Sequence, residues 1–376
     1  MLETFNFWEL FVMGILGFAT LIQLFYYLVV YSKLAFYKQP EALYTQDLPP
    51  VSVIIAARNE YNFLEKNLKT ILEQDYPSFE VIVVNDCSWD DSQKLLEYYQ
   101  EVYPNLRICQ LIEQEKYPTG KKFAITMGIK AATFNQMFFT DADCVPASNQ
   151  WLRLMQSRFQ DGKEIVLGYS PYKKYSGILN LFIRYESVFT AINYFSAAIG
   201  KNAFIGVGRN LAYTRDLFFK HKGFASHQHI LSGDDDLFVN QAATADNVAI
   251  QLDPQSFVNT EPKKTFESWQ RQKARHVSTG KYYKAKHQLF LGAYYASLFL
   301  FYAAIITLLI LRVDWEIILF FYALRFVIQT AILYFIFTKL KCMSLIWFIL
   351  LLDFLYLIYI GIFGTTGLFA KNKKVW

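Results

Sequence analysis

The stretch PPVSVIIAARNE, residues 49–60, decides the class of fold. Its short run of β-branched and apolar residues, 51–56, lies between two prolines and a polar end. This pattern is typical of a strand that is buried on both faces of a parallel sheet. The segment that follows, 63–74, has apolar residues at helical spacing: Leu64, Leu68, Ile71 and Leu72. The sequence therefore predicts the first strand and helix of a β-α-β unit.

The same alternation continues to residue 143. Further strands are predicted to end at Asp86, Ile112 and Asp143, with helices at 92–104 and 121–132. The alternation indicates an α/β fold whose mostly parallel sheet has helices on both faces. Ligands of such sheets bind beyond the carboxyl ends of the strands. We therefore expect Asn59, Glu60, Asp86 and the pair Asp141 and Asp143 to face one crevice.

The acidic pair lies in FFTDADCVP, residues 138–146. Two carboxylates at a strand end are costly unless a positive group lies between them or both face water, and a lone Asp-x-Asp is most often a solvated turn. The chain has neither Gly-x-Gly-x-x-Gly nor a Walker sequence for binding phosphate. Mg²⁺ is commonly held by one or two carboxylates together with substrate phosphates. The position of the pair therefore favours a metal–diphosphate site.

Two later segments add candidate site residues. LSGDDDLFVN, residues 231–240, has three consecutive aspartates, of which one suffices to cap a helix. SWQRQKARHVSTGKYYKAKH, residues 268–287, is basic, aromatic and amphipathic, as in a helix lying on a membrane surface. If Arg275 also reaches the crevice, it would stabilise a diphosphate leaving group.

Four apolar runs predict membrane segments: 10–30, 289–311, 315–337 and 345–369. Glu3 and Glu9 argue against a cleavable signal peptide. Basic residues next to the first two runs place the middle of the chain in the cytoplasm. Three full crossings would then carry the basic tail, 371–376, outside, so we expect one C-terminal run to be re-entrant or interfacial.

Charged residues inside the apolar runs, and the cysteines, have simple interpretations. Arg325 and Asp353 lie near the middle of their runs, where they either pair across helices or line a groove for a lipid head group. The net charge of +5 comes from basic residues beside membrane segments, which favours membrane lipids over nucleic acid as partners. The four cysteines have no metal-site spacing and are expected to be reduced thiols.

Taken together, these motifs resemble the membrane-bound family 2 glycosyltransferases, which have a GT-A (Rossmann-like) catalytic domain. The resemblance covers residues 50–285 and rests on VIIAARNE, VIVVNDCSWDDS, TGKKFAITMG, DAD, GVGRNLAYTR, GDDDL and QKAR in the family's order. It implies four parts: a transmembrane anchor at 1–45, a GT-A domain at 46–265, an amphipathic interface segment at 266–288 and transmembrane helices at 289–376.

The resemblance also implies roles for individual residues. Donor-binding roles fall on Glu60, Asp86, Lys121, Asp141 and Gln272. Asp141 and Asp143 match the family's Asp-x-Asp, which holds Mg²⁺ or Mn²⁺ on the diphosphate. The acidic block assigns the general base to Asp234, or to Asp235 if the chain is aligned on Gly-Asp-Asp, and Arg275 would stabilise the leaving group.

Two departures from the family pattern affect function. Gly233 replaces the usual Glu of the acidic block, and QKAR is followed by His276 where processive synthases have Trp. The resemblance therefore implies an inverting, metal-dependent hexosyltransferase (EC 2.4) that uses a nucleotide sugar, commonly a UDP-sugar, and a lipid or glycan acceptor in a bacterial inner membrane. The alternatives are a processive polysaccharide synthase and a catalytically inactive membrane scaffold.

Overall fold

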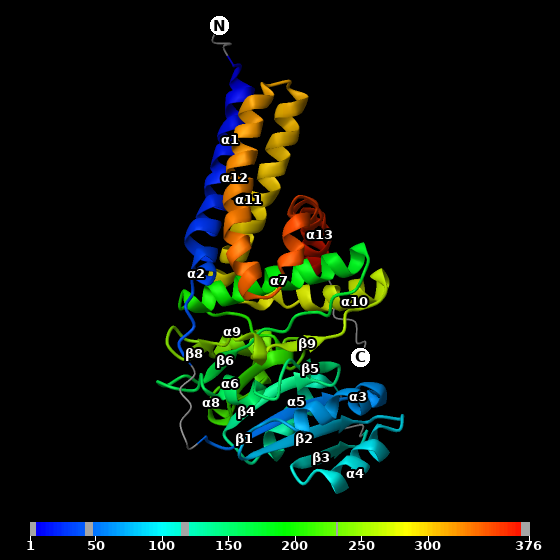
Figure 1. Ribbon diagram of the computed structural model, residues 1–376. Coiled ribbons are helices and arrows are strands. Elements are labelled where there is room, and N and C mark those ends of the chain that lie inside the picture. Colours follow the sequence, from blue (N-terminus) through cyan, green and yellow to red (C-terminus); the bar gives the residue numbers. More distant parts are fainter. Residues whose placement is uncertain (1–4, 42–47, 114–119, 231, 370–376) are drawn as a thin grey trace.

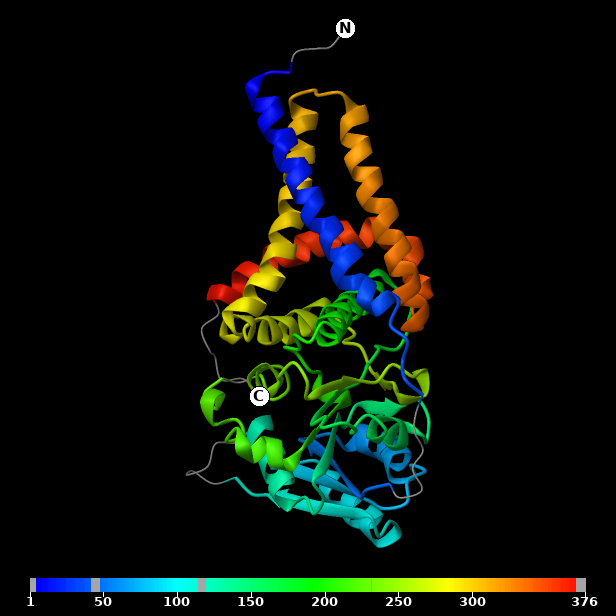
Figure 2. The same ribbon diagram turned by 90° about the vertical axis from the view of Figure 1, so that its left-hand side faces the viewer.

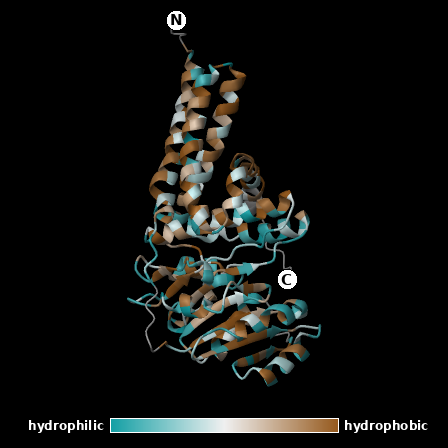
Figure 3. Cartoon of the chain, in the orientation of Figure 1, coloured by the Kyte–Doolittle hydropathy of each residue, from teal (hydrophilic) through white to brown (hydrophobic). Residues whose placement is uncertain are grey.

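The computed structural model describes residues 5–41, 48–113, 120–230 and 232–369. The predicted boundary between residues 45 and 46 and the basic tail lie outside these ranges. An α/β domain lies below a set of long helices, with further helices between them (Figure 1). Figure 3 shows that the long helices are mostly hydrophobic, whereas the α/β domain has polar residues over much of its surface.

The main sheet has seven strands among the described residues, in the order β3-β2-β1-β4-β7-β6-β8. The strands are β1 (Val51–Ala57), β2 (Phe79–Asp86), β3 (Leu106–Leu111), β4 (Gln136–Asp141), β6 (Ile165–Leu167), β7 (Leu211–Thr214) and β8 (Val248–Ile250). Strands β3, β2, β1 and β4 are parallel, as is the pair β6 and β8, while β7 is antiparallel to both neighbours. The prediction of a mostly parallel α/β sheet is confirmed.

Helices cover both faces of this sheet because the strand side chains alternate between two hydrophobic clusters. One cluster joins Ile54 and Val84 to α5 (Lys121–Ala131). The other joins residues such as Val53 and Val83 to helices on the opposite face. Those helices are α3 (Tyr61–Leu72), α4 (Ser92–Val102) and α6 (Trp151–Gln156). The smaller elements are α8 (Arg215–Lys220), α9 (Asp236–Ala242) and a ribbon of β5 (Cys144–Pro146) with β9 (Val258–Thr260).

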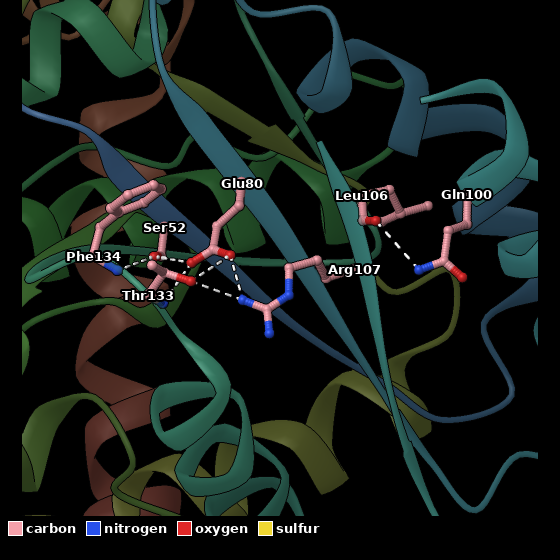
Figure 4. A network of polar contacts seen from close by, with 7 residues as sticks. All are labelled: Ser52, Glu80, Gln100, Leu106, Arg107, Thr133 and Phe134. Atoms are coloured by element: carbon pink, nitrogen blue, oxygen red, sulfur yellow. Dashed lines mark hydrogen bonds and ion pairs between the residues drawn. The ribbon is translucent and has the colours of Figure 1, made fainter. Parts of the chain in front are cut away.

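A buried carboxylate fixes the strand register at the amino end of the sheet (Figure 4). Glu80 accepts hydrogen bonds from Ser52 Oγ, Arg107 Nη1 and the Thr133 N–H, each at 2.6 Å. Ser52 Oγ in turn accepts from the Phe134 N–H. Although burial acts to raise it, these donors hold the pKa of Glu80 below its usual value. The network ties β1, β2, β3 and the start of β4 together, at the edge opposite the predicted site.

Within the described ranges, four helical segments are long and apolar enough to cross a membrane: Phe7–Ala35, Ala285–Ile310, Trp315–Lys339 and Met343–Gly364. They contain α1 (Phe7–Phe25), α2 (Ser32–Ala35), α11 (Ala285–Ile310), α12 (Trp315–Lys339) and α13 (Ile349–Phe369). Figure 2 shows α1, α11 and α12 running away from the α/β domain, whereas α13 crosses near their lower ends. That one C-terminal run is re-entrant or interfacial stays a prediction, and α13 is the run whose direction differs from the others.

The two charged residues inside these segments form an ion pair, as one of the two alternatives predicted. Arg325 on α12 contacts both carboxylate oxygens of Asp353 on α13, at 2.9 and 3.0 Å. Gln329 and Tyr302 also donate to Asp353, and Gln23 on α1 accepts from Arg325. Because the partners come from four helices, the pair fixes α13 against α1, α11 and α12.

Two helices lie between the sheet and the membrane helices: α7 (Ile178–Ile199) and α10 (Phe266–Val277) (Figure 1). The hydrophobic cluster on the α5 face of the sheet continues without a break through α7 into α11, α12 and α13. The α/β domain and the membrane helices therefore share one core. The four cysteines are free thiols, as predicted.

Candidate functional site

The loops after β1 and β2 are held together at the carboxyl edge of the sheet. Asn59 has a positive φ of 56°, a conformation that Asn tolerates better than most residues. Its N–H donates to Ser88 Oγ and its Oδ1 accepts from the Trp89 N–H, both at 2.9 Å. Arg58 lies over the Trp89 ring. These contacts build one wall of the crevice expected from the sequence.

Asp86 ends β2, which is a neighbour of β1 in the sheet. Its side chain is 1% exposed, and burial raises its pKa above the usual value. Neither carboxylate oxygen makes a hydrogen bond of good geometry among the described residues, although the Cys87 thiol and the Gly120 N–H lie nearby. A buried acid without a full set of partners is costly unless a ligand supplies the donors.

Lys121, at the start of α5, joins the two acidic segments that the sequence analysis singled out. Its Nζ is 2.8 Å from Asp141 Oδ1 and 3.4 Å from Asp234 Oδ2. Although burial opposes it, the two carboxylates raise the pKa of Lys121. Burial likewise acts to raise the pKa of Asp141, but Lys121 and Arg209 hold it below its usual value. The single positive charge of Lys121 thus lies between two carboxylates, and these three side chains together have a net negative charge.

The residues around Asp143 fit a hard divalent cation. Ligand atoms of Asp141, Asp143 and Cys144 lie within 4.8 Å of one another. Burial and the neighbouring Asp141 raise the pKa of Asp143, and burial raises the pKa of the Cys144 thiol well above its usual value. A protonated thiol is a poor ligand, whereas the oxygen atoms of the two carboxylates suit Mg²⁺ or Mn²⁺. Glu60 lies near this pair, and burial together with Asp143 raises its pKa to about 7.

The three consecutive aspartates point to three different partners. Asp235 caps α9, and its Oδ2 accepts the Gly208 N–H at 2.8 Å. Asp236 accepts from the hydroxyl groups of Thr279 and Tyr283. The Asp234 carboxylate contacts Lys121. Burial and the two neighbouring acids raise the pKa of Asp235 to about 7. Asp235 and Asp236 therefore organise the loops, and Asp234 faces the other acidic segment.

Gly233 explains one departure from the family pattern. Its φ is +94°, and a Cβ built there would lie 2.4 Å from Leu237 Cδ1. A left-handed backbone and a close contact both exclude larger side chains. Glycine is therefore required by the turn that presents the aspartates.

A cavity of about 530 Å³ connects these residues to the helices above them. Of the residues predicted from the sequence, it is lined by Glu60, Lys121, Asp141, Asp143, Asp234, Asp235, Gln272 and Arg275. Asp86 does not line the cavity and lies at the adjoining strand end. His276 also lines it, and enclosure together with nearby cations lowers the pKa of this residue.

Sequence reasoning missed several residues that line the same cavity. Arg58, Arg209 and Lys263 add positive charge near the acidic pair. Arg209 lies over the Tyr172 ring, 4.5 Å from its centroid, and was within a quoted motif. Glu186 and Lys273 form a buried ion pair between α7 and α10. Their signal was a carboxylate inside the apolar run ILNLFIRYESVF, residues 178–189.

Comparisons with known proteins agree with this arrangement. Residues 52–221 match the family described as Glycosyl transferase family 2. Over 110 residues, the chain is 37% identical to "Glycosyltransferase AglE" of Haloferax volcanii, covering 29% of this chain and 34% of that protein. Over 161 residues, it is 23% identical to a "Poly-beta-1,6-N-acetyl-D-glucosamine synthase" of Staphylococcus epidermidis, covering 39% and 38%. The chain spans about a third of the length of the curated relatives that it matches.

The overall structure is similar to that of "Mannosyltransferase PcManGT from Pyrobaculum calidifontis in complex with GDP-Man and Mn2+". The TM-score is 0.59 at 19% identity, and the match covers 93% of this chain and 99% of the other. At this identity the likeness concerns the fold, and it confirms the predicted GT-A domain with flanking membrane helices.

Proposed function

We propose that this chain transfers a sugar from a nucleotide-sugar donor to an acceptor presented by the membrane, since residues 52–221 match the family described as Glycosyl transferase family 2. The observation that carries the proposal is the single cavity that joins the acidic strand ends to tyrosines of α11 and α13. A donor bound at the sheet and an acceptor bound at the membrane helices would therefore lie in the same cavity.

Donor binding is assigned to the residues at the strand ends. The buried carboxylate of Asp86 would accept hydrogen bonds from the nucleobase, and Glu60 would lie beside the ribose and the diphosphate. Lys121, Arg209 and Arg275 would neutralise the diphosphate. The comparison proteins named above include one with bound GDP-Man, and the family resemblance favours a UDP-sugar, so both nucleotides belong in the first test.

Asp141 and Asp143 are the residues that would hold Mg²⁺ or Mn²⁺. When bound there, the ion would stabilise negative charge on the diphosphate oxygens. Lys121 and the metal ion would then both contact Asp141. Lys121 can give up part of this contact because it also contacts Asp234.

Asp234 is the proposed general base. It would remove the proton of an acceptor hydroxyl group, whose oxygen forms a bond to the anomeric carbon as the bond from that carbon to the diphosphate breaks. Attack from the side opposite the leaving group inverts the anomeric configuration. Arg275 and Gln272, both on α10, would hold the departing diphosphate from the membrane side.

We propose an integral membrane protein whose catalytic domain lies in the cytoplasm, as in a bacterial inner membrane. Basic residues lie at or just beyond the ends of the first two candidate spans that face the α/β domain: Lys33, Lys38, Lys281, Lys284 and Lys286. Such residues remain on the cytoplasmic side.

The test is release of nucleoside diphosphate by the full chain in lipid nanodiscs. UDP- and GDP-sugars are supplied with Mg²⁺ or Mn²⁺, and a membrane lipid extract serves as the acceptor. We expect metal-dependent turnover that Asp143→Asn abolishes and that Asp216→Asn, at an exposed acid on α8, leaves intact. The product length then separates single transfer from processive synthesis. Absence of both turnover and nucleotide binding would refute the proposal in favour of an inactive scaffold.

A further inference from the structure

The membrane side of the cavity has a different composition from the donor side. There it is lined by Glu186 of α7, Lys273 of α10, Tyr295 of α11, and Tyr356 and Tyr359 of α13. We call these five residues the tyrosine chamber. They come from four helices, and none of them has a role in the donor site proposed above.

The charges in the tyrosine chamber cancel. Lys273 and Glu186 form an ion pair, with side chains only 8% and 7% exposed. An ion pair this well buried leaves no free cation for a second phosphate group, because the carboxylate would repel it. The chamber is therefore polar but electrically neutral, unlike the cationic residues around the acidic pair.

Polar atoms in and beside the tyrosine chamber are incompletely satisfied. The hydroxyl groups of Tyr295 and Tyr356 are 3.4 Å apart, which is long for a hydrogen bond. Gln272 Oε1 and the Tyr169 hydroxyl, which face the same cavity, are buried without a hydrogen-bond partner among the described residues. Buried polar atoms without partners are rare unless a ligand or water completes them.

The aromatic rings present flat apolar faces beside these polar atoms. Tyr356 and Tyr359 are stacked, with ring centroids 5.7 Å apart and an angle of 24° between the rings. A sugar ring has the complementary surface, since its hydroxyl groups form hydrogen bonds at the edge while its C–H face packs on an aromatic ring. The sites of small ligands combine apolar walls with a few converging polar groups in this way.

Apolar residues of the candidate membrane spans complete the lining. Leu291 of α11 and Ile360 and Phe363 of α13 belong to the same cavity. A ligand whose sugar lies in the tyrosine chamber can therefore extend an alkyl chain along α11 and α13.

We propose that the tyrosine chamber binds the sugar head group of a glycolipid, and that this glycolipid is the acceptor. The inference rests on the proposed function and narrows the acceptor from any lipid or glycan to a lipid that already has a sugar. Glu186 and the tyrosine hydroxyl groups bind the sugar, whose reactive hydroxyl group points along the cavity toward Asp234.

The experiment measures binding without requiring turnover. The full chain in phosphatidylcholine nanodiscs is labelled with a decyl β-glucoside that has a photoreactive diazirine next to the sugar. We expect labelled peptides from α10, α11 and α13, and we expect decyl β-maltoside to compete while decyl phosphate does not. Competition by decyl phosphate alone, or labelling unrelated to these helices, would overturn the inference.

Matched variants test the named residues. Tyr356→Phe and Glu186→Gln should each lower labelling about tenfold, the effect of a lost hydrogen bond of about 1.4 kcal/mol. Tyr334→Phe, at an exposed tyrosine on α12, should have no effect. Because Glu186→Gln leaves Lys273 buried without its partner, Glu186→Gln combined with Lys273→Met provides a neutral variant for the same measurement. Unchanged labelling in these variants would refute the assignment.

The outcome is distinguishable from failure of the proposed function. Donor turnover without labelling of the chamber would leave the transferase intact and remove the glycolipid acceptor. Labelling of the chamber without turnover of any donor would leave a glycolipid-binding site and remove both the transferase and the role of the glycolipid as its acceptor.

Discussion

Replacing Asp234 and Asp235 one at a time by asparagine separates two neighbouring acids that the sequence leaves as alternative bases. The structure predicts different results because the two carboxylates have different partners. Asp234 contacts Lys121, whereas Asp235 accepts the N–H groups of Gly208 and Asp236. Asparagine preserves the shape of the side chain, so a comparison of the two variants isolates the loss of charge.

For Asp234→Asn we expect a large loss of kcat with the fold preserved. A general base contributes about 10²–10⁴ in rate, which corresponds to about 3–5 kcal/mol of the barrier. Lys121 keeps its partner Asp141 at 2.8 Å, so donor binding and thermal stability should change little.

For Asp235→Asn we expect the reverse. Its amide has only one acceptor oxygen for two N–H donors, so one hydrogen bond is lost, at a cost of about 1–3 kcal/mol of stability. We expect kcat to fall by less than about tenfold.

The assay combines nucleoside diphosphate release in nanodiscs with thermal unfolding of the same samples. Asp216→Asn, at an exposed acid, is the control for loss of one negative charge. If Asp235→Asn is folded and loses far more activity than Asp234→Asn, the reasoning is refuted and Asp235 is the base.

Three further predictions concern stability, each measured by thermal unfolding in detergent. Gly233→Ala should cost at least about 1–2 kcal/mol because φ is +94° and Leu237 must move; an unchanged melting temperature would contradict this. Burial lowers the pKa of Lys122 to about 8, so the unfolded state binds more protons between about pH 8 and 10.5, and stability gains up to about 3 kcal/mol over that window. Lys122→Met should lack this gain in stability. Parallel profiles of stability against pH for the original chain and Lys122→Met would refute the role of Lys122. Arg325→Met should cost about 3–5 kcal/mol by leaving Asp353 unpaired, and more than Arg325→Met with Asp353→Leu; equal losses would refute the pairing argument.

The parallel half of the sheet could be predicted from the sequence because its signals are local. The predicted strand at 51–56 is β1, Val51–Ala57, and the strand predicted to end at Asp86 is β2. Buried parallel strands read as continuous apolar runs, and the amphipathic helices between them have a clear period.

The antiparallel half could not be predicted in the same way. Strands β6 and β8 have three residues each and pair with partners distant in the sequence, so they show no period of their own. Helix α7 is apolar on most sides because it packs between the sheet and the membrane helices, and its sequence gives no amphipathic pattern.

The candidate site divides along the same line. Residues at the ends of parallel strands, such as Asp141, could be predicted from topology alone. The tyrosine chamber depends on how α13 crosses its neighbours, and that orientation is set by the contacts of Asp353 with residues of α11 and α12. Which tyrosines meet is therefore a property of the packed structure rather than of any local segment.

The hydrophobic cluster that runs from β1 through α7 into the membrane helices determines which membrane-bound groups the catalytic domain can contact. A catalytic domain on a flexible linker can swing and sample acceptors at many heights above the lipid. Here the shared core holds the domain at a fixed distance from the bilayer and in a fixed orientation. Only groups that protrude from the bilayer as far as the acidic residues can reach them. The rigid attachment of the domain to the membrane helices therefore contributes to substrate selection.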